Sequence, residues 1–405
     1  MDKIQKKILI MGGGINQTSL IEAARKEGYY TVLCDANPNA LCSRMADKFC
    51  TFDISNGTLL TQIAKNNNVD GIVCNTESLM STLAVVQSNL GAVGNTVESV
   101  ENISDKYKFR KIQKNAHTFA PEIEKFSEYN AAKLYVDTLK EDLIIKPELS
   151  SGSRGVSIIK TGSSLSRNIF DECISFSRNG HILIERFIDF RDKVALEAEV
   201  FILNGRVELL CLFRTIRDRK LNILPQCYCS GTDQDEHMKN EIQNVLQKVF
   251  KEAGITWGEY NVELSFTPTN QIFIIEINAR QGGMRLPEFV QEYTGIDLDR
   301  LLVTTAVNDF SYLNTINRNT DSWDNNYIHY RVLLDTNGTY GGYEISDELG
   351  PFLTSEFDYI EPGTIVNKGN NQYVTVALLD FKFDNIAQRK KYEDCLDELV
   401  TVNIS

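Results

Sequence analysis

The first hundred residues repeat a pattern of apolar run, glycine or polar turn, and amphipathic stretch, which limits the fold more than any other feature. The run KKILIM leads through glycines into QTSLIEAARKEG, and then into a second apolar run, YTVLCD. FCTFD, NGTLLTQIAKNNN, VDGIVCN and LMSTLAVVQSNLG continue the alternation. Strands that alternate with helices pair in parallel through right-handed crossovers. The sequence therefore predicts an N-terminal parallel sheet.

The glycine turn that opens this repeat resembles a dinucleotide fingerprint only in part. Gly12 and Gly14 supply G-x-G, but Gln17 stands where the third glycine of the fingerprint belongs. Asp35 ends the second strand, where the fingerprint has its ribose-binding acid. An NAD(P)-binding protein is therefore one interpretation. We prefer a tight turn whose helix N-terminus faces a cleft, where it would meet an anionic group of a substrate.

Composition excludes several classes of partner. The formal net charge of −13 argues against binding to a nucleic-acid backbone, which requires a clustered basic surface. No run reaches the roughly 18 apolar residues of a membrane span, and the basic N-terminus lacks a signal-peptide pattern. The nine cysteines are scattered, as expected for reduced thiols. We expect a cytoplasmic protein without a nucleic-acid or membrane partner.

The pattern changes after about residue 104, where hairpins replace the alternation. VALEAEVFILNGRVELLCLFRT reads as two strands joined at Asn204-Gly205, a strong hairpin signal. GEYNVELSFTPTNQIFIIEINAR reads as a second hairpin, and a helix is expected from Leu298 to Val307. The last ninety residues are mixed, with strands expected near YIHYRVLLD and QYVTVALLD.

The second of these hairpins carries three oxygen-bearing side chains in apolar surroundings. Glu276 and Asn278 are two residues apart on one strand, so they share a face. If Glu263 pairs across on that face, three hard oxygen ligands converge, which suits magnesium bound together with phosphates. A solvated strand face with incidental acids is the alternative. The apolar flanks of IFIIEI favour the metal site.

Lys146 leaves the apolar strand of IIKPELSSGSRGVSIIK and needs an anionic partner there. The glycine and serine residues that follow are small enough for backbone N–H groups to approach phosphate oxygens. The sequence is not a P-loop, which requires G-K-[ST] at the start of a helix. A simple turn is the alternative, but the lysine favours phosphate binding.

The order of these motifs resembles the ATP-grasp superfamily of carboxylate–amine (or thiol) ligases. SDKYKFRK, IIKPELSSGSRGV, ILIERFID and VELSF…FIIEINARQGG follow one another with family-like spacing between about Asp105 and Val307. The resemblance implies an α/β protein, α+β in the grasp part. Residues 1–103 would form a parallel-sheet pre-ATP-grasp domain, 104–188 a linker helix and lid subdomain, 189–310 an antiparallel catalytic subdomain, and 311–405 a C-terminal α/β subdomain packed on the grasp.

The resemblance also implies roles for individual residues. Lys106 and Lys146 would contact the ATP phosphates, and Arg280 would meet the transferred phosphoryl group. Glu263, Glu276 and Asn278 would bind Mg²⁺ or Mn²⁺. The loop from Ser150 to Val156 would close over the phosphates as a lid; its predicted nucleotide contacts are Ser151, Gly152, Ser153, Gly155 and Val156. At the adenosine the predicted contacts are Glu185, Phe187, Ile188 and Asp192, with Glu197 as a rival of Asp192 for the ribose.

Candidate substrate-binding residues follow the same strands. Arg214 and Arg217, expected after a cleft-lining strand, could bind a substrate carboxylate, as could Arg285; an exposed basic turn is the alternative for the first two. Gly282 and Gly283 would let the acceptor approach closely.

The implied function is phosphorylation of a carboxylate to an acyl phosphate, followed by coupling to an amine. Within the superfamily the chain looks most like the L-amino-acid ligase and carbamoyl-phosphate-synthase-like group, so amino acids are the expected substrates. Activation of bicarbonate by a carboxylase or carbamoyl-phosphate-type enzyme is the alternative, and a non-catalytic nucleotide sensor is a third interpretation. Relatives are often homodimers.

Overall fold

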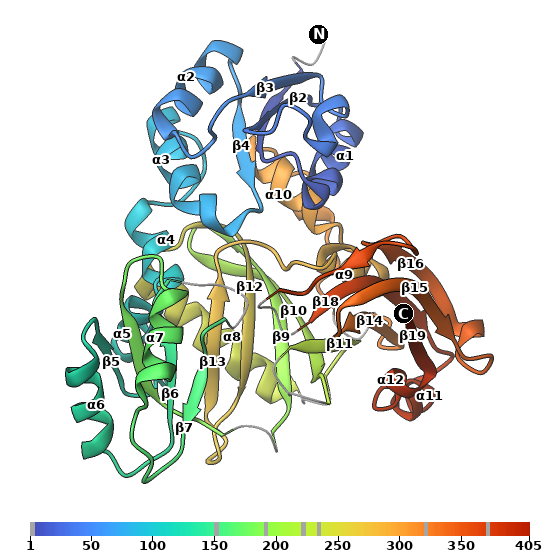
Figure 1. The fold of residues 1–405 in the computed structure, drawn as a ribbon. Helices are drawn as coiled ribbons and strands as arrows, with labels where there is room; N and C mark the ends of the chain where they lie inside the picture. Colours follow the sequence, from blue (N-terminus) through green and yellow to red (C-terminus); the bar gives the residue numbers. More distant parts are fainter. Residues whose placement is uncertain are drawn as a thin grey trace.

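The computed structural model describes residues 5–149, 154–189, 193–219, 224–232, 236–319, 323–369 and 373–405. Figure 1 shows an N-terminal part stacked above a broad β-rich part, with the C-terminal strands to one side. Within the described ranges, none of the helices is both long and apolar enough to span a bilayer.

The N-terminal part is built on a parallel sheet of four strands in the order β3-β2-β1-β4, which confirms the predicted alternation. Its central strands are buried because helices cover both faces. The strands are β1 (Lys7–Met11), β2 (Tyr30–Asp35), β3 (Lys48–Thr51) and β4 (Gly71–Cys74). The helices are α1 (Thr18–Lys26), α2 (Gly57–Asn67) and α3 (Met80–Leu90).

One helix on this sheet comes from far along the chain. α10 (Leu298–Ala306) contacts α1 and β4, and Figure 1 shows it against the N-terminal part. Leu301 and Leu302 of α10 share a hydrophobic cluster with Ile10 and Leu20. This packing fixes the N-terminal part over the β-rich part.

Two helices link these parts. α4 (Val97–Ser104) ends at Asp105, whose side chain accepts hydrogen bonds from the N–H groups of Tyr107 and Lys108 at 2.9 and 3.0 Å. Asp105 is thus the N-cap of α5 (Lys106–Asn115), because a carboxylate there satisfies N–H groups of the first turn. The cap places Lys106 at the start of α5.

A four-stranded antiparallel sheet in the order β5-β8-β6-β7 follows α5. The predicted hairpin around Lys146 is its β6–β7 pair. The strands are β5 (Ile123–Phe126), β6 (Leu143–Pro147), β7 (Ser157–Ile159) and β8 (Ile182–Arg186). Its helices are α6 (Tyr129–Thr138) and α7 (Arg167–Ser175).

The large antiparallel sheet has eight strands in the order β13-β12-β9-β10-β11-β14-β18-β16. Both predicted hairpins are present, and Asn204 and Gly205 adopt positive φ values of 51° and 73° in the β9–β10 turn. The strands are β9 (Ala195–Leu203), β10 (Arg206–Arg217), β11 (Pro225–Ser230), β12 (Trp257–Phe266), β13 (Ile272–Asn278), β14 (Tyr327–Leu334), β16 (Leu353–Asp358) and β18 (Val374–Lys382). α8 (Glu236–Ala253) packs on β10, and α9 (Leu286–Thr294) follows β13.

The pairing of β11 with β14 joins the third and fourth predicted segments of the chain in one sheet. The predicted boundary at residue 310 thus lies between strands of a single sheet, and the division of the chain into four parts stays a prediction. The remaining C-terminal elements are β15 (Gly338–Ile345), β17 (Ile365–Val366), β19 (Val400–Ile404), α11 (Ile386–Tyr392) and α12 (Leu396–Leu399).

The contact between β4 and α10 can be tested at a glycine. A Cβ added to Gly71 would lie 2.3 Å from the carbonyl oxygen of Ala306. Gly71→Ala should therefore lower the free energy of unfolding by about 1–3 kcal/mol through overpacking, measured by urea denaturation. Gly350→Ala is the control, because nothing lies within 4 Å of its added Cβ. Equal stability of the two variants would contradict the packing described.

Candidate active site

Carboxylates and amides form two rows across strands β9, β12 and β13. Glu263 on β12 lies opposite Glu276 on β13 and opposite Glu197 on β9. The neighbouring row consists of Asn261 on β12, between Asn278 and Glu199. The predicted opposition of Glu263 and Glu276 is therefore confirmed. We refer to these six residues as the acidic rows.

Hydrogen bonds hold the second row in place. The amide nitrogen of Asn261 donates to one carboxylate oxygen each of Glu197 and Glu199, both at 2.8 Å. Its amide oxygen accepts from Asn278 at 3.1 Å. The backbone N–H of Gly282 donates to Glu199 at 2.9 Å. Because each partner is itself fixed on a strand or turn, the oxygens have defined positions.

Burial and mutual repulsion disfavour negative charge on these carboxyl groups. Burial, with the charge of Glu263, raises the pKa of Glu197 to about 8. Burial also raises the pKa of Glu199 well above its usual value, and burial and Glu276 raise that of Glu263. A cation placed among the rows would allow the carboxylates to ionise. The chemistry of the donors, two carboxylates and an amide at the predicted positions, fits Mg²⁺.

The predicted ligand set includes only two carboxylates. Among the residues that the structure describes, no group of three or more His, Cys, Asp or Glu side chains has metal-binding geometry. A magnesium ion held by Glu263, Glu276 and Asn278 would therefore need further oxygens, which substrate phosphates and water usually supply. The ligand set stays a prediction.

Three cationic side chains surround the acidic rows. The ammonium of Lys106 lies 3.0 Å from Glu276, and the guanidinium of Arg217 lies 3.6 Å from Glu263. Arg280, two residues after Asn278, lies 3.4 Å from Glu77 of the N-terminal part. Burial works to raise the pKa of Glu276, but the charge and hydrogen bond of Lys106, aided by Lys146 and Arg110, lower it.

Lys146 reaches the site from β6 and is held by a buried carboxylate. Its ammonium lies 2.9 Å from Glu185 on β8, and the side chain of Lys146 is 12% exposed. Burial lowers the pKa of Lys146, while Glu185 works in the opposite direction. Because Glu185 also accepts hydrogen bonds from Arg110 at 3.0 and 3.3 Å, both its oxygens are occupied. Glu185, predicted at the adenine, therefore positions Lys146 through its side chain.

Arg110 is a functional residue that the sequence interpretation missed. It is 2% exposed and also donates to the backbone carbonyls of Ile274 and Ile275 on β13, each at 3.0 Å. It thereby ties α5 and β8 to the strand that carries Glu276. The available signal was the apolar residues Phe109 and Ile112, which place Arg110 near the buried face of α5.

Several predicted nucleotide contacts fall on or beside parts of the chain without described structure. Ser151, Gly152, Ser153 and Asp192 lie outside the described residues. Gly155 has a φ of +71°, and Val156 is exposed. Beyond β8, Phe187 is half-buried and Ile188 is buried. Their roles stay predictions.

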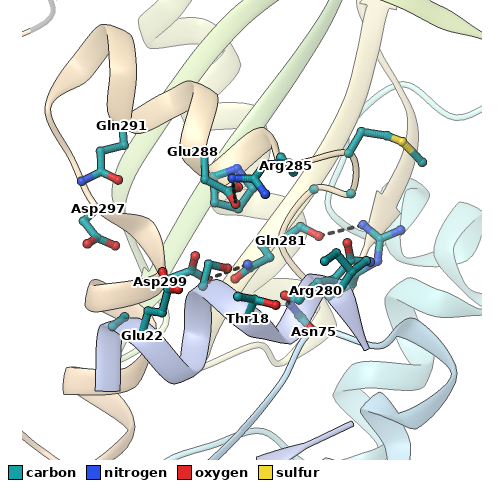
Figure 2. Close-up of a pocket in the computed structure, with 18 of the residues that line it drawn as sticks. Thr18, Glu22, Asn75, Arg280, Gln281, Arg285, Glu288, Gln291, Asp297 and Asp299 are labelled. Atoms are coloured by element: carbon teal, nitrogen blue, oxygen red, sulfur yellow. Dashed lines mark hydrogen bonds and ion pairs between the residues drawn. The ribbon is translucent and has the colours of Figure 1, made fainter. Parts of the chain in front are cut away.

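A cavity of about 500 Å³ opens beside Arg280, between the N-terminal part and the large sheet. Figure 2 shows α1 along one side and the segment from Arg280 through α9 to Asp299 along the other. The predicted substrate residues Gly282, Gly283 and Arg285 all line it. Gly282 allows the carboxylate of Glu199 to lie close to the backbone, because a Cβ there would lie 2.3 Å from a carboxylate oxygen of Glu199.

The two arginines of β10 lie on different faces. Both belong to the strand itself, not to a turn after it, and they are three residues apart. Arg217 faces the acidic rows, whereas Arg214 forms an ion pair with Glu393 near the C-terminus. Arg214 therefore does not join the cluster around Glu263.

The start of the helix after the glycine turn faces the cavity, as predicted, since Ile15, Asn16, Thr18 and Ser19 line it. Binding of an anionic group there stays a prediction, and the glycines themselves have their N–H groups engaged. The N–H of Gly13 donates to Asp35 at 2.6 Å, and that of Gly14 donates to Gln17 at 2.8 Å. The N–H of Gly12, whose φ is +91°, donates to Cys34 at 2.8 Å. The donors of the turn are thus occupied by the chain's own oxygens, and Gln17 and Asp35 close the turn.

The fold and the site together combine a parallel-sheet domain with antiparallel sheets that bring acidic and basic side chains together. Residues 139–288 match the ATP-grasp domain family. This match confirms the resemblance of the motifs to the ATP-grasp superfamily and makes residues 139–288 an ATP-grasp domain.

The similar proteins cover different shares of the chain. Formate-dependent phosphoribosylglycinamide formyltransferase of Prochlorococcus marinus is 26% identical over 69% of this chain and 71% of its own length. The carbamoyl phosphate synthase large chain of a Thermotoga species is 23% identical over 75% of this chain but only 28% of its own length. The crystal structure of the L-amino acid ligase of Bacillus licheniformis shares the fold over all of both chains, with a TM-score of 0.79 and 17% identity.

The buried ion pair can be tested by removing one charge. Glu185→Gln leaves Arg110 and Lys146 buried without their counterion, so it should cost about 3–5 kcal/mol at neutral pH. Burial opposes ionisation of Glu185, but Arg110 and Lys146 outweigh it and lower its pKa to about 2.

The cost of Glu185→Gln should also depend on pH. The folded pKa of Glu185 lies below the unfolded value of about 4.3, so its stabilisation is full above that value and is lost as the pH falls towards 2. Chemical denaturation should show the variant and the native chain converging in stability in acid. A difference that does not change with pH would contradict this account.

Proposed function

We propose that the chain uses ATP to activate a carboxylate as an acyl phosphate and couples it to an amine, with amino acids as substrates. The observation that carries the proposal is the juxtaposition of three features. The acidic rows, the ammonium groups of Lys106 and Lys146, and the cavity that begins at Arg280 adjoin one another. Phosphoryl transfer depends on this kind of charge neutralisation beside a substrate site.

Each charged group has a task in the proposed reaction. Glu263, Glu276 and Asn278 would hold Mg²⁺ or Mn²⁺, which supplies charge neutralisation to the phosphates. Lys106 and Lys146 would bind phosphate oxygens. Glu185 keeps Lys146 in place and charged, since a buried lysine without a counterion tends to lose its proton. Arg280 would stabilise the phosphoryl group as it moves towards the cavity.

The proposed reaction has two steps, phosphorylation of the acid and attack by the amine. A carboxylate oxygen attacks the terminal phosphorus of ATP, and the bond from that phosphorus to the bridging oxygen breaks, which releases ADP. The amine nitrogen then attacks the acyl carbon, the carbon–oxygen bond to phosphate breaks, and the nitrogen loses a proton. Because water destroys acyl phosphates, the reaction requires a site that excludes solvent.

The cavity supports an organic acceptor of substantial size. About 500 Å³ is within the range of sites for small organic ligands. Amino-acid substrates also accord with the fold shared with an L-amino acid ligase. Bicarbonate activation is the alternative outcome, and the similarity to a carbamoyl phosphate synthase keeps it in the test.

Lys146→Ala and Glu276→Ala test the location of the nucleotide site. Each removes a charge at the proposed phosphate or metal position, so binding of ATP with Mg²⁺ should weaken at least about tenfold, as ion pairs at buried sites are worth more than 1.4 kcal/mol. Lys133→Ala is the control, because Lys133 pairs with Asp137 on the exposed surface of α6. Calorimetric titration with a non-hydrolysable ATP analogue provides the measurement. Unchanged affinity in both site variants would place the nucleotide elsewhere.

A screen with hydroxylamine tests acid activation without knowledge of the amine. Hydroxylamine converts an acyl phosphate to a hydroxamate, so the acid substrate should give ADP and hydroxamate in equal amounts. The panel contains amino acids, small organic acids and bicarbonate, with products identified by mass spectrometry. ADP release that depends on bicarbonate alone would favour the alternative. Absence of ADP and hydroxamate with every acid of the panel would contradict the proposed function.

A further inference from the structure

The charges that line the cavity are unequally distributed. Its lining contains five carboxylates, namely Glu22, Glu77, Glu288, Asp297 and Asp299, but only three basic side chains. Two of the basic groups are already engaged, because Arg280 lies 3.4 Å from Glu77 and Arg285 lies 3.3 Å from Glu288. Among the described residues, Glu22, Asp297 and Asp299 form no ion pair.

The third basic group does not neutralise these acids. Lys26 lies one turn beyond Glu22 on α1, and the two are not paired in the described structure. Figure 2 shows Arg280 at one end of the lining and Asp297 and Gln291 at the other, with Asp299 between them. The end of the cavity away from Arg280 is therefore its acidic end.

The wall of the cavity also has a buried acceptor without a donor. The amide nitrogen of Gln281 donates to Asp299 at 2.8 Å, and both residues are 4% exposed. The amide oxygen of Gln281 is buried and accepts no hydrogen bond. Behind it, both carboxyl oxygens of Glu259 are likewise buried without a donor. Buried acceptors of this kind are costly unless a ligand or water donates to them.

Burial and the nearby Glu288 raise the pKa of Asp299 to about 7. A cation beside Asp299 would favour its ionised form. An anion would do the opposite, and the N–H groups of Gly13 and Gly14 are not available to bind one, since they donate to Asp35 and Gln17. The acidic end of the cavity thus offers negative charge and hydrogen-bond acceptors, which are the complement of an ammonium group.

We infer that the amine acceptor carries a second cationic group, as a diamine or a basic amino acid does, and that this group binds between Glu22, Asp297 and Asp299. The inference rests on the proposed function for the reacting amine at the Arg280 end. The second ammonium would donate to Asp299 and to the free amide oxygen of Gln281. The acidic end would thereby select acceptors by charge.

Matched pairs of amines test the inference. L-Lysine and L-norleucine differ in one ammonium group, as do 1,4-diaminobutane and butylamine. With the acid found by the hydroxylamine screen, the cationic member of each pair should have a kcat/KM at least about tenfold higher, which corresponds to about 1.4 kcal/mol. Neutral members that react equally well would overturn the inference.

Charge-removing variants locate the effect. Glu22→Gln, on the exposed face of α1, and Asp299→Asn, which keeps the shape of the side chain, should each reduce the preference for the cationic amine severalfold through KM. Lys26→Met should increase it, because a competing positive charge is removed. Glu292→Gln is the control, since Glu292 is exposed on α9 and does not line the cavity. An unchanged preference in Glu22→Gln and Asp299→Asn would overturn the inference.

Calorimetric titration of the same four amines into the protein separates this inference from the proposed function. Tighter binding of the cationic amines, weakened by Glu22→Gln, supports the acidic end even if no acid forms a hydroxamate. Equal binding within each pair overturns it even if acid activation is observed.

Discussion

The buried ion pairs of Glu185 with Arg110 and with Lys146 are the interactions on which the arrangement of the site depends. They join α5, β6 and β8, and the guanidinium of Arg110 also binds the backbone of β13. Three charges that are largely buried are stable only if each has a partner. The carboxylate that pairs with Arg110 therefore also favours the charged form of Lys146 and holds it in place.

The acidic rows bring several buried carboxyl groups close together. Glu197, Glu199 and Glu263 share neighbouring strands, and burial and repulsion raise the pKa of each. Cationic groups from other elements relieve this repulsion: Lys106 from α5 and Arg217 from β10. Under the proposed function, a metal ion and phosphates would balance each other's charges at this site. The residues proposed to hold the metal ion and the phosphates lie on separate elements that Arg110 of α5 connects.

The sequence predicted features that depend on local periodicity. Alternation of strand and helix gave the parallel sheet, and the two-residue period of IFIIEIN gave the shared face of Glu276 and Asn278. It did not predict α10 on the N-terminal sheet, because apolar faces pair by shape and give no signal of which distant surface they cover. The same limit applies to the pairing of β11 with β14.

The sequence also did not predict which polar residues pair over long distances in the chain. Arg110 and Glu185 are 75 residues apart, and nothing in either motif indicates the other. The glycine turn is ambiguous for a related reason. Gln17 and Asp35 accept hydrogen bonds from its N–H groups, and the sequence does not show whether an acid at the end of a strand binds a ribose or the chain's own backbone. The order of the motifs, however, indicated the ATP-grasp domain that residues 139–288 match, because several weak signals agreed.

The formation of an acyl phosphate is the central claim, and transfer of an isotope tests it most directly. The acid substrate is labelled with ¹⁸O in its carboxylate and incubated with ATP and the amine, and the released phosphate is examined by mass spectrometry. Attack of the carboxylate on the terminal phosphorus predicts one ¹⁸O atom in each inorganic phosphate. Label in AMP, or phosphate without label, would contradict the proposed route.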